Sequence, residues 1–274
     1  MKSPYVTAEL GPLRQRMISA RATSRPALVI YLTHGDPSPA ETVDIIEAAV
    51  RGGADVIELG VPFSDPSADG PVIQAAMERA LRAGGGRAGA LDTIAELRTR
   101  RCYVPIVLFG YYNPIFVYGV ERFAADAASV GVDAVLTVDL PFEELDELLG
   151  PLAERDVGVI PLLAPTSTED RLARVAALAP PFVYYISMTG VTGATLAGGV
   201  GLALRISDIR RVTGAAVAVG FGIKTPADAV AIASMADAVV VGSAVVQRIA
   251  EAAPGTAPAA VERFVAELKA ALPR

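Results

Sequence analysis

The sequence of 274 residues contains no tryptophan, one cysteine and one histidine. Because Cys102 is the only cysteine, a disulfide within the chain is excluded, and the lone His34 excludes histidine-rich metal sites. Both features fit a reducing cytoplasm. Long apolar runs are also missing, since Asp228, Asp237 and Gly242 break the longest ones, and the first thirty residues carry no secretory pattern. We therefore expect a cytoplasmic protein that is neither exported nor inserted into a membrane.

Positive charge is too scarce to attract polyanions. The chain has 24 lysines and arginines against 30 aspartates and glutamates, a net charge of −6 and an isoelectric point near 5.0. An acidic protein without a basic patch is not drawn to nucleic acid or to an anionic membrane. We interpret two groups of arginines as solvated helix faces: Arg14, Arg16, Arg21 and Arg25, then Arg98, Arg100 and Arg101.

Apolar residues, in contrast, make up 52% of the chain and recur in short β-branched runs. Each run is apolar nearly throughout, which is typical of parallel strands covered on both faces. The runs are ALVIYLT (27–33), DVIELG (55–60), PIVLFG (105–110), AVLTVD (134–139), GVIPLLA (158–164), FVYYIS (182–187), AAVAVGFG (215–222) and AVVVGSA (238–244).

Helical spacing fills the segments between these runs. In TPADAVAIASMA, for example, we expect Thr225 to cap a helix whose first turn contains Pro226. Eight strand–helix alternations in about 250 residues predict an α/β fold, a single (β/α)8 TIM barrel. A doubly wound open sheet is the alternative. We expect one domain over 1–274, with an extension and capping helix in 1–26 and a closing helix in 251–274.

Acidic side chains are concentrated in IELGVPFSDPSADGP (57–71), after the second run. In TIM barrels the active site lies at the carboxyl ends of the strands. Partial burial there would raise the pKa of Glu58 and suit it to acid–base chemistry, whereas the competing interpretation is a structural glutamate bonded to a backbone group or a tyrosine. Asp69 lies beyond a constrained loop and can face Glu58 across the barrel mouth. We interpret Asp65 as a turn former.

Glycines follow the sixth, seventh and eighth runs, in GVTG (190–193), GFG (220–222) and GS (242–243). Loops seven and eight of TIM barrels frequently bind phosphate, because backbone N–H groups can approach an anion where no Cβ intervenes. Ser243 adds a hydroxyl at an expected helix start. One such cluster is weak evidence, but three at consecutive strand ends favour a phosphate site.

Five motifs together resemble the tryptophan synthase alpha subunit family, over about residues 28–249. They are IELGVPFSDPSADGPVIQ, PIVLFGYYNPIFVYGVERF, VDLPFEE, FVYYISMTGVTG and VAVGFGIKTP. The resemblance implies a (β/α)8 barrel that splits indole-3-glycerol phosphate into indole and glyceraldehyde 3-phosphate by a retro-aldol reaction. It also implies that this chain needs no cofactor or metal.

The resemblance assigns roles to individual residues. Glu58 would protonate carbon 3 of the indole ring and help to remove the proton of the adjacent hydroxyl, and Asp69 would accept a hydrogen bond from the indole nitrogen. Tyr184 would bring a hydroxyl near Glu58, with a core aromatic as the alternative. The indole pocket or its closing loop would include Tyr31, Ile73, Tyr111 and Thr192, and the phosphate site Gly193, Phe221, Gly222, Gly242 and Ser243.

A protein partner is implied as well. The family's beta subunit carries pyridoxal phosphate and receives indole through a tunnel, so an alpha2beta2 heterotetramer is expected. The surface facing it would contain Asp65, Pro66, Asn113, Pro114, Phe116 and Pro141. On the bare sequence these are surface turns, and NPIF (113–116) reads as an exposed apolar loop.

Several positions depart from the family pattern. Ser67 replaces a bulky aliphatic residue, and His34 replaces a small or apolar one; we interpret His34 as a loop side chain at the barrel mouth rather than a catalytic group. Gly110 and Val138 are also unusual. The segment 194–208 lacks the expected charges, and its glycines predict a mobile lid.

Three functions therefore remain open. The first is the alpha subunit acting with its beta partner in tryptophan synthesis. The second is a free-standing lyase that releases indole, which the altered partner-facing and lid positions would permit. The third is a catalytically silent barrel that activates a beta subunit, against which the intact Glu58 and Asp69 argue.

Overall fold

The strands of the computed structural model, which describes residues 11–186, 196–220 and 222–273, form one parallel sheet. Its order is β5-β4-β3-β2-β1-β9-β8-β7-β6. The bounds are β1 (Ala27–Thr33), β2 (Val56–Gly60), β3 (Ile106–Gly110), β4 (Ala134–Thr137), β5 (Gly158–Val159), β6 (Leu162–Leu163), β7 (Phe182–Tyr185), β8 (Ala216–Val219) and β9 (Ala238–Val241). All eight apolar runs of the sequence thus contain strands.

The two outer members of this order, β5 and β6, are halves of one strand that closes the sheet. The break falls at Ile160 and Pro161. Even there, the Ile160 N–H donates to the Val135 carbonyl at 2.9 Å, and the Pro161 carbonyl accepts from the Tyr184 N–H at 3.0 Å. Since β5 pairs with β4 and β6 with β7, the sheet is an eight-stranded barrel. The predicted (β/α)8 fold is confirmed, and the open-sheet alternative is wrong.

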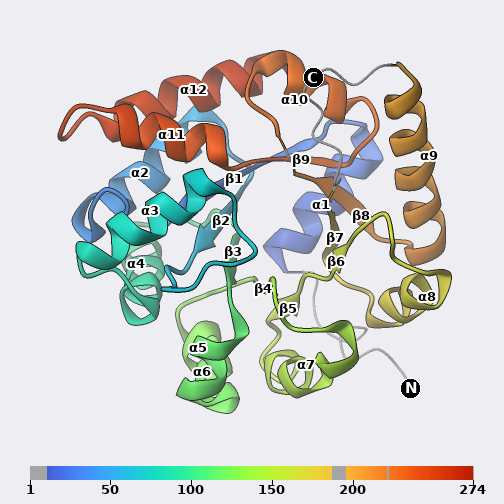
Figure 1. Cartoon of the computed structure of the whole chain (residues 1–274), viewed down its shortest axis with the longest axis horizontal. Helices are drawn as coiled ribbons and strands as arrows, with labels where there is room; N and C mark the ends of the chain where they lie inside the picture. Colours follow the sequence, from blue (N-terminus) through green and yellow to red (C-terminus); the bar gives the residue numbers. More distant parts are fainter. Residues whose placement is uncertain (1–10, 187–195, 221, 274) are drawn as a thin grey trace.

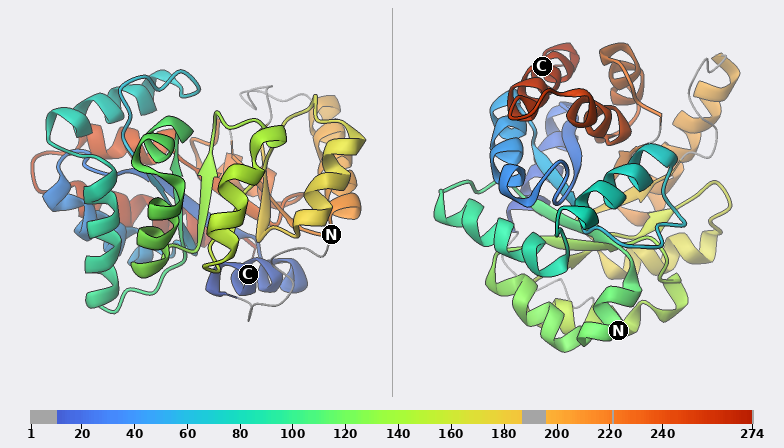
Figure 2. Two further views of the ribbon diagram at one scale, coloured as in Figure 1. Left: turned by 90° about the horizontal axis from the view of Figure 1, so that it is seen from below. Right: turned by 60° about the vertical axis from the view of Figure 1, so that its left-hand side comes forward.

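Helices surround the barrel, as Figures 1 and 2 show. Thr225 caps α10 by accepting from the N–H of Asp228, as expected from the sequence. The helices are α1 (Pro12–Thr23), α2 (Pro39–Gly52), α3 (Pro71–Arg82), α4 (Arg87–Thr99), α5 (Tyr112–Tyr118), α6 (Val120–Ser129), the 3-10 helix η1 (Phe142–Glu144), α7 (Asp146–Ala153), α8 (Glu169–Leu178), α9 (Leu196–Thr213), α10 (Pro226–Ala233), α11 (Ser243–Glu251) and α12 (Ala257–Ala271). In the described ranges, none of these helices is long and apolar enough to span a membrane.

Helix α1 closes the amino-terminal end of the barrel, which lies at the bottom of the left view in Figure 2. Leu13 and Met17 are buried in the same cluster as Val29 and Val56 of the barrel interior. The predicted capping helix is confirmed. Its arginines are not simply solvated, because Arg16 forms an ion pair with Asp55 at 2.9 Å.

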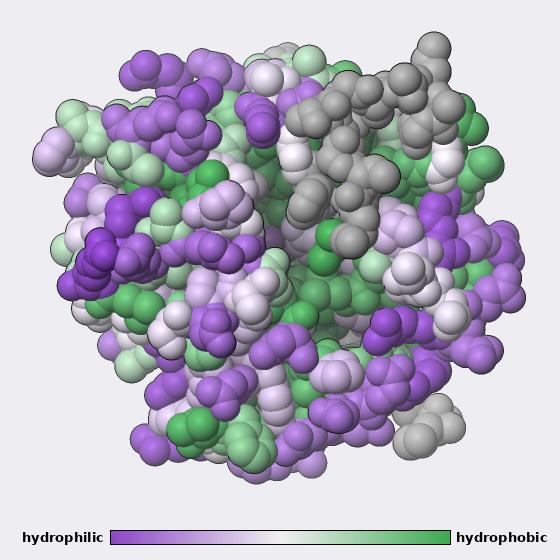
Figure 3. Space-filling view, in the orientation of Figure 1, coloured by the Kyte–Doolittle hydropathy of each residue, from purple (hydrophilic) through white to green (hydrophobic). Residues whose placement is uncertain are grey.

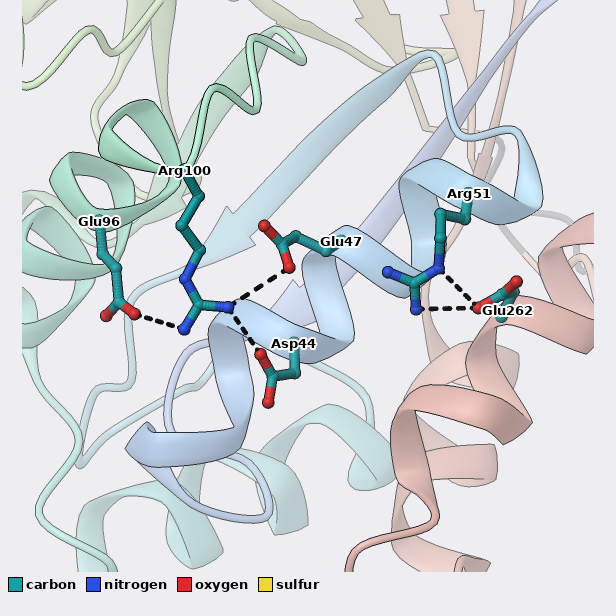
Figure 4. Close-up of polar contacts among 6 residues, drawn as sticks. All are labelled: Asp44, Glu47, Arg51, Glu96, Arg100 and Glu262. Carbon is teal, nitrogen blue, oxygen red and sulfur yellow. Dashed lines mark hydrogen bonds and ion pairs between the residues drawn. The ribbon is translucent and has the colours of Figure 1, made fainter.

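Charged side chains connect three outer helices, as Figure 4 shows. At the end of α4, Arg100 pairs with Glu96 at 2.6 Å and reaches Asp44 of α2 at 2.9 Å. Arg51 of α2 pairs with Glu262 of α12 at 2.9 Å. Exposed pairs of this kind contribute only about 0–1 kcal/mol each. Arg100 is exposed, as the sequence predicts, but both arginines also join neighbouring helices.

Arg98 behaves differently from the solvated residue that the sequence predicts. Its guanidinium donates to the carbonyls of Cys102 and Val104 at 2.8 and 3.0 Å, and to the Gly131 carbonyl at 2.8 Å. The prediction was wrong because helical spacing alone does not reveal that two loops converge on this side chain.

Candidate active site

Glu58 lies within β2, where it pairs in register with Tyr31 of β1 and Val107 of β3. Its side chain is buried, with 1% of the residue exposed, and within the described ranges no group bonds to its Oε1. Burial raises the pKa of Glu58 from 4.5 to about 8. At neutral pH the carboxyl group therefore holds a proton. A structural glutamate that bonds to a backbone group or a tyrosine does not account for an Oε1 without a partner.

Asp69 occupies the loop between β2 and α3 and is half-buried. The Tyr111 hydroxyl donates to Asp69 Oδ2 at 2.6 Å and accepts from the Ala68 N–H at 3.0 Å. Burial raises the pKa of Asp69, and the Tyr111 hydrogen bond partly offsets that rise. Among the described residues this carboxylate has no other hydrogen bond, so its Oδ1 is available to a ligand.

Two tyrosine hydroxyls lie over glycines of neighbouring strands. A Cβ at position 60 would lie 2.3 Å from the hydroxyl of Tyr31, and a Cβ at position 220 would lie 2.3 Å from the hydroxyl of Tyr184. These distances are far below contact range, so Gly60 and Gly220 are required by the two tyrosines. Gly220 therefore accommodates a side chain rather than an anion.

Tyr184 shares the electrostatic environment of the two carboxyl groups. Burial raises the pKa of Tyr184 well above its usual value, and the nearby Glu58, Tyr31 and Asp69 raise it further. Burial also raises the pKa of Tyr31, whose hydroxyl accepts from Thr33 Oγ1 at 3.3 Å. Both tyrosines therefore stay protonated and can donate hydrogen bonds to a ligand.

Three of the expected pocket residues belong to one buried cluster. Tyr31, Ile73 and Tyr111 pack together there with Met77 and Val246. Two further aromatic rings support this wall: Phe109 lies edge-on to Tyr31 with centroids 5.2 Å apart, and Phe63 packs on Tyr111 at 4.9 Å. The cluster is an apolar surface that suits an aromatic ligand. Thr192, the fourth expected pocket residue, lies outside the described residues.

A cavity of about 310 Å³ lies beside this cluster, along β4, the broken strand β5/β6 and Ile186 just after β7, and neither Glu58 nor Asp69 lines it. Val138 contributes both to the cavity and to the edge of the cluster. Figure 3 shows a hollow near the middle of this face of the molecule, with apolar residues inside it and polar residues around it. The volume lies within the usual range of about 300–1,000 Å³ for small-molecule sites.

Of the residues expected to bind phosphate, Gly242 lies beside this cluster. Gly242 precedes α11, and Ser243 is the first residue of that helix and is exposed. A Cβ at Gly242 would contact Tyr31 at 3.4 Å, so this helix end adjoins the aromatic wall. Gly222 is exposed and has a left-handed φ of 70°. Gly193 and Phe221 lie outside the described residues.

The expected partner-facing residues are all at least partly accessible. Asp65, Asn113 and Pro141 are exposed, and Pro66 and Pro114 are intermediate. The apolar loop expected at NPIF is instead part of α5, and Ile115 is buried at 6% exposure. That prediction was wrong because a helical turn separates neighbouring side chains and sends Ile115 inward. Phe116, at 57% exposure, stays on the surface beside the exposed Val117.

The predicted lid at 194–208 is also largely incorrect, because residues 196–208 belong to α9. Ile206 and Ile209 are fully buried on one face of that helix. Their spacing, together with Leu202, is helical, and this signal outweighs the glycines that suggested a loop. Residues 194 and 195 lie outside the described ranges.

The structure also shows the surroundings of the other residues that depart from the family pattern. His34 is buried against α4, where its Nδ1 lies 3.3 Å from Thr93 Oγ1, and burial lowers its pKa to about 4. It therefore does not reach the pocket as an exposed loop residue. Ser67 is exposed, and a Cβ at Gly110 would meet only Val61. Among the described residues, no group of histidine, cysteine and acidic side chains could hold a metal.

Several site residues escape sequence reasoning. Thr33, Phe63, Met77 and Val246 contact the expected residues but carry no motif of their own. Gly60 offered a signal, since a glycine ending a buried strand often marks a close approach. Thr33 bonds to Tyr31 within its own strand, whereas Phe63, Met77 and Val246 became apparent only when the fold brought distant segments together.

Comparison with known proteins places the chain in a family. The model of the family "Tryptophan synthase alpha chain" matches residues 17–272. The alpha chain of Burkholderia pseudomallei (strain 1106a) is 49% identical over 263 residues, covering 96% of this chain and 97% of the relative. That of Geobacter sulfurreducens is 49% identical over 249 residues, covering 91% and 94%.

Solved structures agree with the sequence relatives. Tryptophan synthase subunit alpha from Legionella pneumophila str. Paris superposes with a TM-score of 0.89 at 34% identity, covering 96% of this chain and 98% of that one. A chain of the aminoacrylate-bound tryptophan synthase from M. tuberculosis gives a TM-score of 0.84 at 33% identity, covering 96% and 100%. On the family match and these relatives, this chain belongs to the tryptophan synthase alpha chain family.

Proposed function

We propose that Glu58 and Asp69 carry out the reaction of this family in this chain. The chain is a lyase of tryptophan biosynthesis, and it cleaves indole-3-glycerol phosphate to indole and glyceraldehyde 3-phosphate. The observation that carries the residue assignment is a buried carboxyl group whose Oε1 has no partner among the described residues, together with Asp69, since both carboxyl groups act on the buried Tyr184 at the carboxyl end of the barrel strands.

Glu58 acts first as an acid. Its pKa of about 8 keeps it protonated at neutral pH, so that it can donate a proton to carbon 3 of the indole ring. The resulting carboxylate then takes the proton of the hydroxyl on the adjacent carbon. As that carbon becomes an aldehyde, the carbon–carbon bond breaks and its electron pair restores the aromatic indole.

Asp69 stabilises the intermediate between these two proton transfers. Protonation at carbon 3 makes the ring nitrogen positive, and a carboxylate that accepts its N–H lowers the energy of that state. Tyr111 occupies Oδ2 of Asp69, so Oδ1 is the atom for this contact. The interaction strengthens as the charge develops, which is the condition for catalysis rather than mere binding.

The rest of the pocket orients the substrate. The wall of Tyr31, Ile73 and Tyr111 supports the proposal that the indole ring binds there, since it is apolar and largely aromatic. Tyr184 would donate a hydrogen bond beside Glu58. The phosphate group would bind at the start of α11, with Gly222, Gly242 and Ser243, where helix N–H groups favour an anion. Thr192, Gly193 and Phe221 are assigned to the pocket and phosphate site by resemblance alone.

The partner belongs to the same proposal. We infer a beta subunit that binds at the surface of Asp65, Pro66, Asn113, Pro114, Phe116 and Pro141 to give an alpha2beta2 complex. Pyridoxal phosphate would then be confined to that subunit, since the chemistry proposed here uses side chains alone. A cytoplasmic location stays a prediction from the sequence.

The test is indole release from indole-3-glycerol phosphate by the purified chain, with and without a beta subunit. We expect a slow rate that rises strongly with beta. Glu58→Gln should remove most of the turnover, about 10²–10⁴-fold, while Glu78→Gln, on the exposed face of α3, serves as the matched control. Normal turnover in Glu58→Gln would refute the acid–base assignment.

Two other outcomes would favour the alternatives. A fast rate that is indifferent to beta would indicate a free-standing lyase. A wild-type chain with no turnover that still stimulates the beta subunit would indicate a silent activator.

A further inference from the structure

Gln74 holds the outer side of the loop that carries Asp69. It lies in the first turn of α3, and its Nε2 donates to the Asp69 carbonyl at 2.8 Å and to the Pro66 carbonyl at 3.2 Å. One side-chain amide therefore bonds to both ends of the segment 66–69. The side chain is exposed.

The same segment is a closed turn. The Pro66 carbonyl also accepts from the N–H of Asp69 at 3.1 Å, and the backbone of Gln74 donates to the Gly70 carbonyl at 3.0 Å. On the inner side, Tyr111 bonds to the Ala68 N–H and to the Asp69 carboxylate. Tyr111 thus orients the side chain of Asp69, whereas Gln74 fixes the backbone from which that side chain extends.

Little packing holds this turn from outside. Ser67 and Ala68 are exposed, so the turn buries few apolar contacts of its own. A surface loop with few buried contacts opens at a low free-energy cost. Its position then depends on the hydrogen bonds that close it, and two of them come from Gln74.

We propose that Gln74 is a positioning residue for Asp69, which it places by closing the turn 66–69 against the start of α3. This inference rests on the proposed function, because the role of Asp69 comes from there. Gln74 touches neither the substrate nor the reacting atoms. Its effect passes entirely through the backbone of residues 66 and 69.

If Gln74 positions Asp69, removing its side-chain amide should lower kcat more than it changes KM. The contact between Asp69 and the ring nitrogen is strongest after the nitrogen becomes positive, so a displaced Asp69 weakens the transition state more than the bound substrate. A loss in kcat with little change in KM is the signature of such an interaction. A purely structural role would instead lower the melting temperature and leave the turnover of the folded protein unchanged.

The experiment compares four variants of the purified chain without beta subunit. Gln74→Met keeps the length and helix propensity but removes both donors, and Gln74→Glu places a carboxylate against the two carbonyls. Gln74→Lys keeps a donor that can reach them. Gln247→Met is the matched control, since Gln247 is an exposed helical glutamine whose Nε2 bonds to Glu251 at 2.8 Å.

We expect kcat to fall roughly tenfold in Gln74→Met, as for the loss of one or two hydrogen bonds, and at least as far in Gln74→Glu. KM and the melting temperature should stay close to wild type, and Gln74→Lys and Gln247→Met should retain most of the turnover. Wild-type kcat in both donor-free variants, or an equal loss in Gln74→Lys, would overturn the inference. A wild-type chain without lyase activity would instead count against the proposed function.

Discussion

The hydroxyl group of Tyr111 lies 2.6 Å from Oδ2 of Asp69 and donates a hydrogen bond to it, while accepting another from the Ala68 N–H at 3.0 Å. This one hydroxyl joins the end of β3 to the loop after β2. The bond lowers the pKa of Asp69 against the effect of burial, so it helps to keep the carboxylate ionised.

Tyr111→Phe should therefore weaken catalysis in a pH-dependent way. Without the hydroxyl, the pKa of Asp69 rises, so the acid limb of the kcat–pH profile should move to higher pH. We expect kcat at neutral pH to fall about tenfold, the scale of a hydrogen bond to a charged group. The measurement is a pH profile of indole release.

Tyr118→Phe is a suitable control, because Tyr118 bonds to Asp126 at 2.5 Å within the outer helices α5 and α6. It should leave the acid limb where it is. An unshifted limb in Tyr111→Phe would show that Tyr111 does not govern the ionisation of Asp69.

Glu58 should make the protein less stable at alkaline pH. Its pKa is about 8 in the folded chain, against the ordinary glutamate value of 4.5. The folded state thus binds the proton more tightly, and stability falls as the pH rises between these values. At pH values above the folded-state pKa, the loss in unfolding free energy approaches roughly 5 kcal/mol, since one pKa unit corresponds to about 1.4 kcal/mol.

Glu58→Gln removes this titration. The variant should melt at nearly the wild-type temperature at pH 5 and clearly above it at pH 9, as measured by thermal unfolding. Glu78→Gln, on the surface, should show no such divergence. Parallel melting curves for wild type and Glu58→Gln across this range would mean that Glu58 is not buried as a neutral acid.

Ser243→Asp tests the proposed phosphate site without disturbing the fold. An acidic side chain at a helix start is favourable for the helix itself, so folding should be retained. The same charge would repel the phosphate group, and we expect KM for indole-3-glycerol phosphate to rise about tenfold or more, the scale of one like-charge contact. Competition by inorganic phosphate checks the site directly.

Ser243→Ala is the matched variant, because it removes the hydroxyl without adding charge. It should raise KM only slightly. Equal KM values in the two variants would place the phosphate elsewhere.

Phe116→Ser tests the proposed partner surface. The side chain is 57% exposed on α5 and adjoins the exposed Val117, so the substitution should leave the fold and the uncoupled rate unchanged. Stimulation by the beta subunit should require a higher beta concentration, because apolar contact area is lost. Titration of turnover with beta measures this shift.

Tyr103→Ser provides the comparison, since Tyr103 is 69% exposed just before β3, at the other end of the barrel. It should not alter the titration. If both variants respond to beta as the wild type does, Phe116 lies outside the interface.

The errors of the sequence predictions share a physical origin. Ile115 and Phe116 looked like one exposed apolar loop, but α5 sends the first inward and leaves the second exposed. The glycines of 194–208 favoured a loop, although Ile206 and Ile209 carry the spacing of a buried helix face. In each case local composition was outweighed by the chance to bury apolar side chains.

The sequence by itself determined the barrel and the candidate carboxyl groups. Eight buried runs alternating with helices admit few architectures, and strand direction alone directs Glu58 and the loop of Asp69 to the carboxyl end. The tertiary structure decided what surrounds them: the burial that raises the pKa of Glu58, the Tyr111 bond to Asp69, and the tyrosine over Gly60. These depend on contacts between neighbouring strands and the loops that follow them, whose residues lie far apart in the chain, so local sequence patterns cannot specify them.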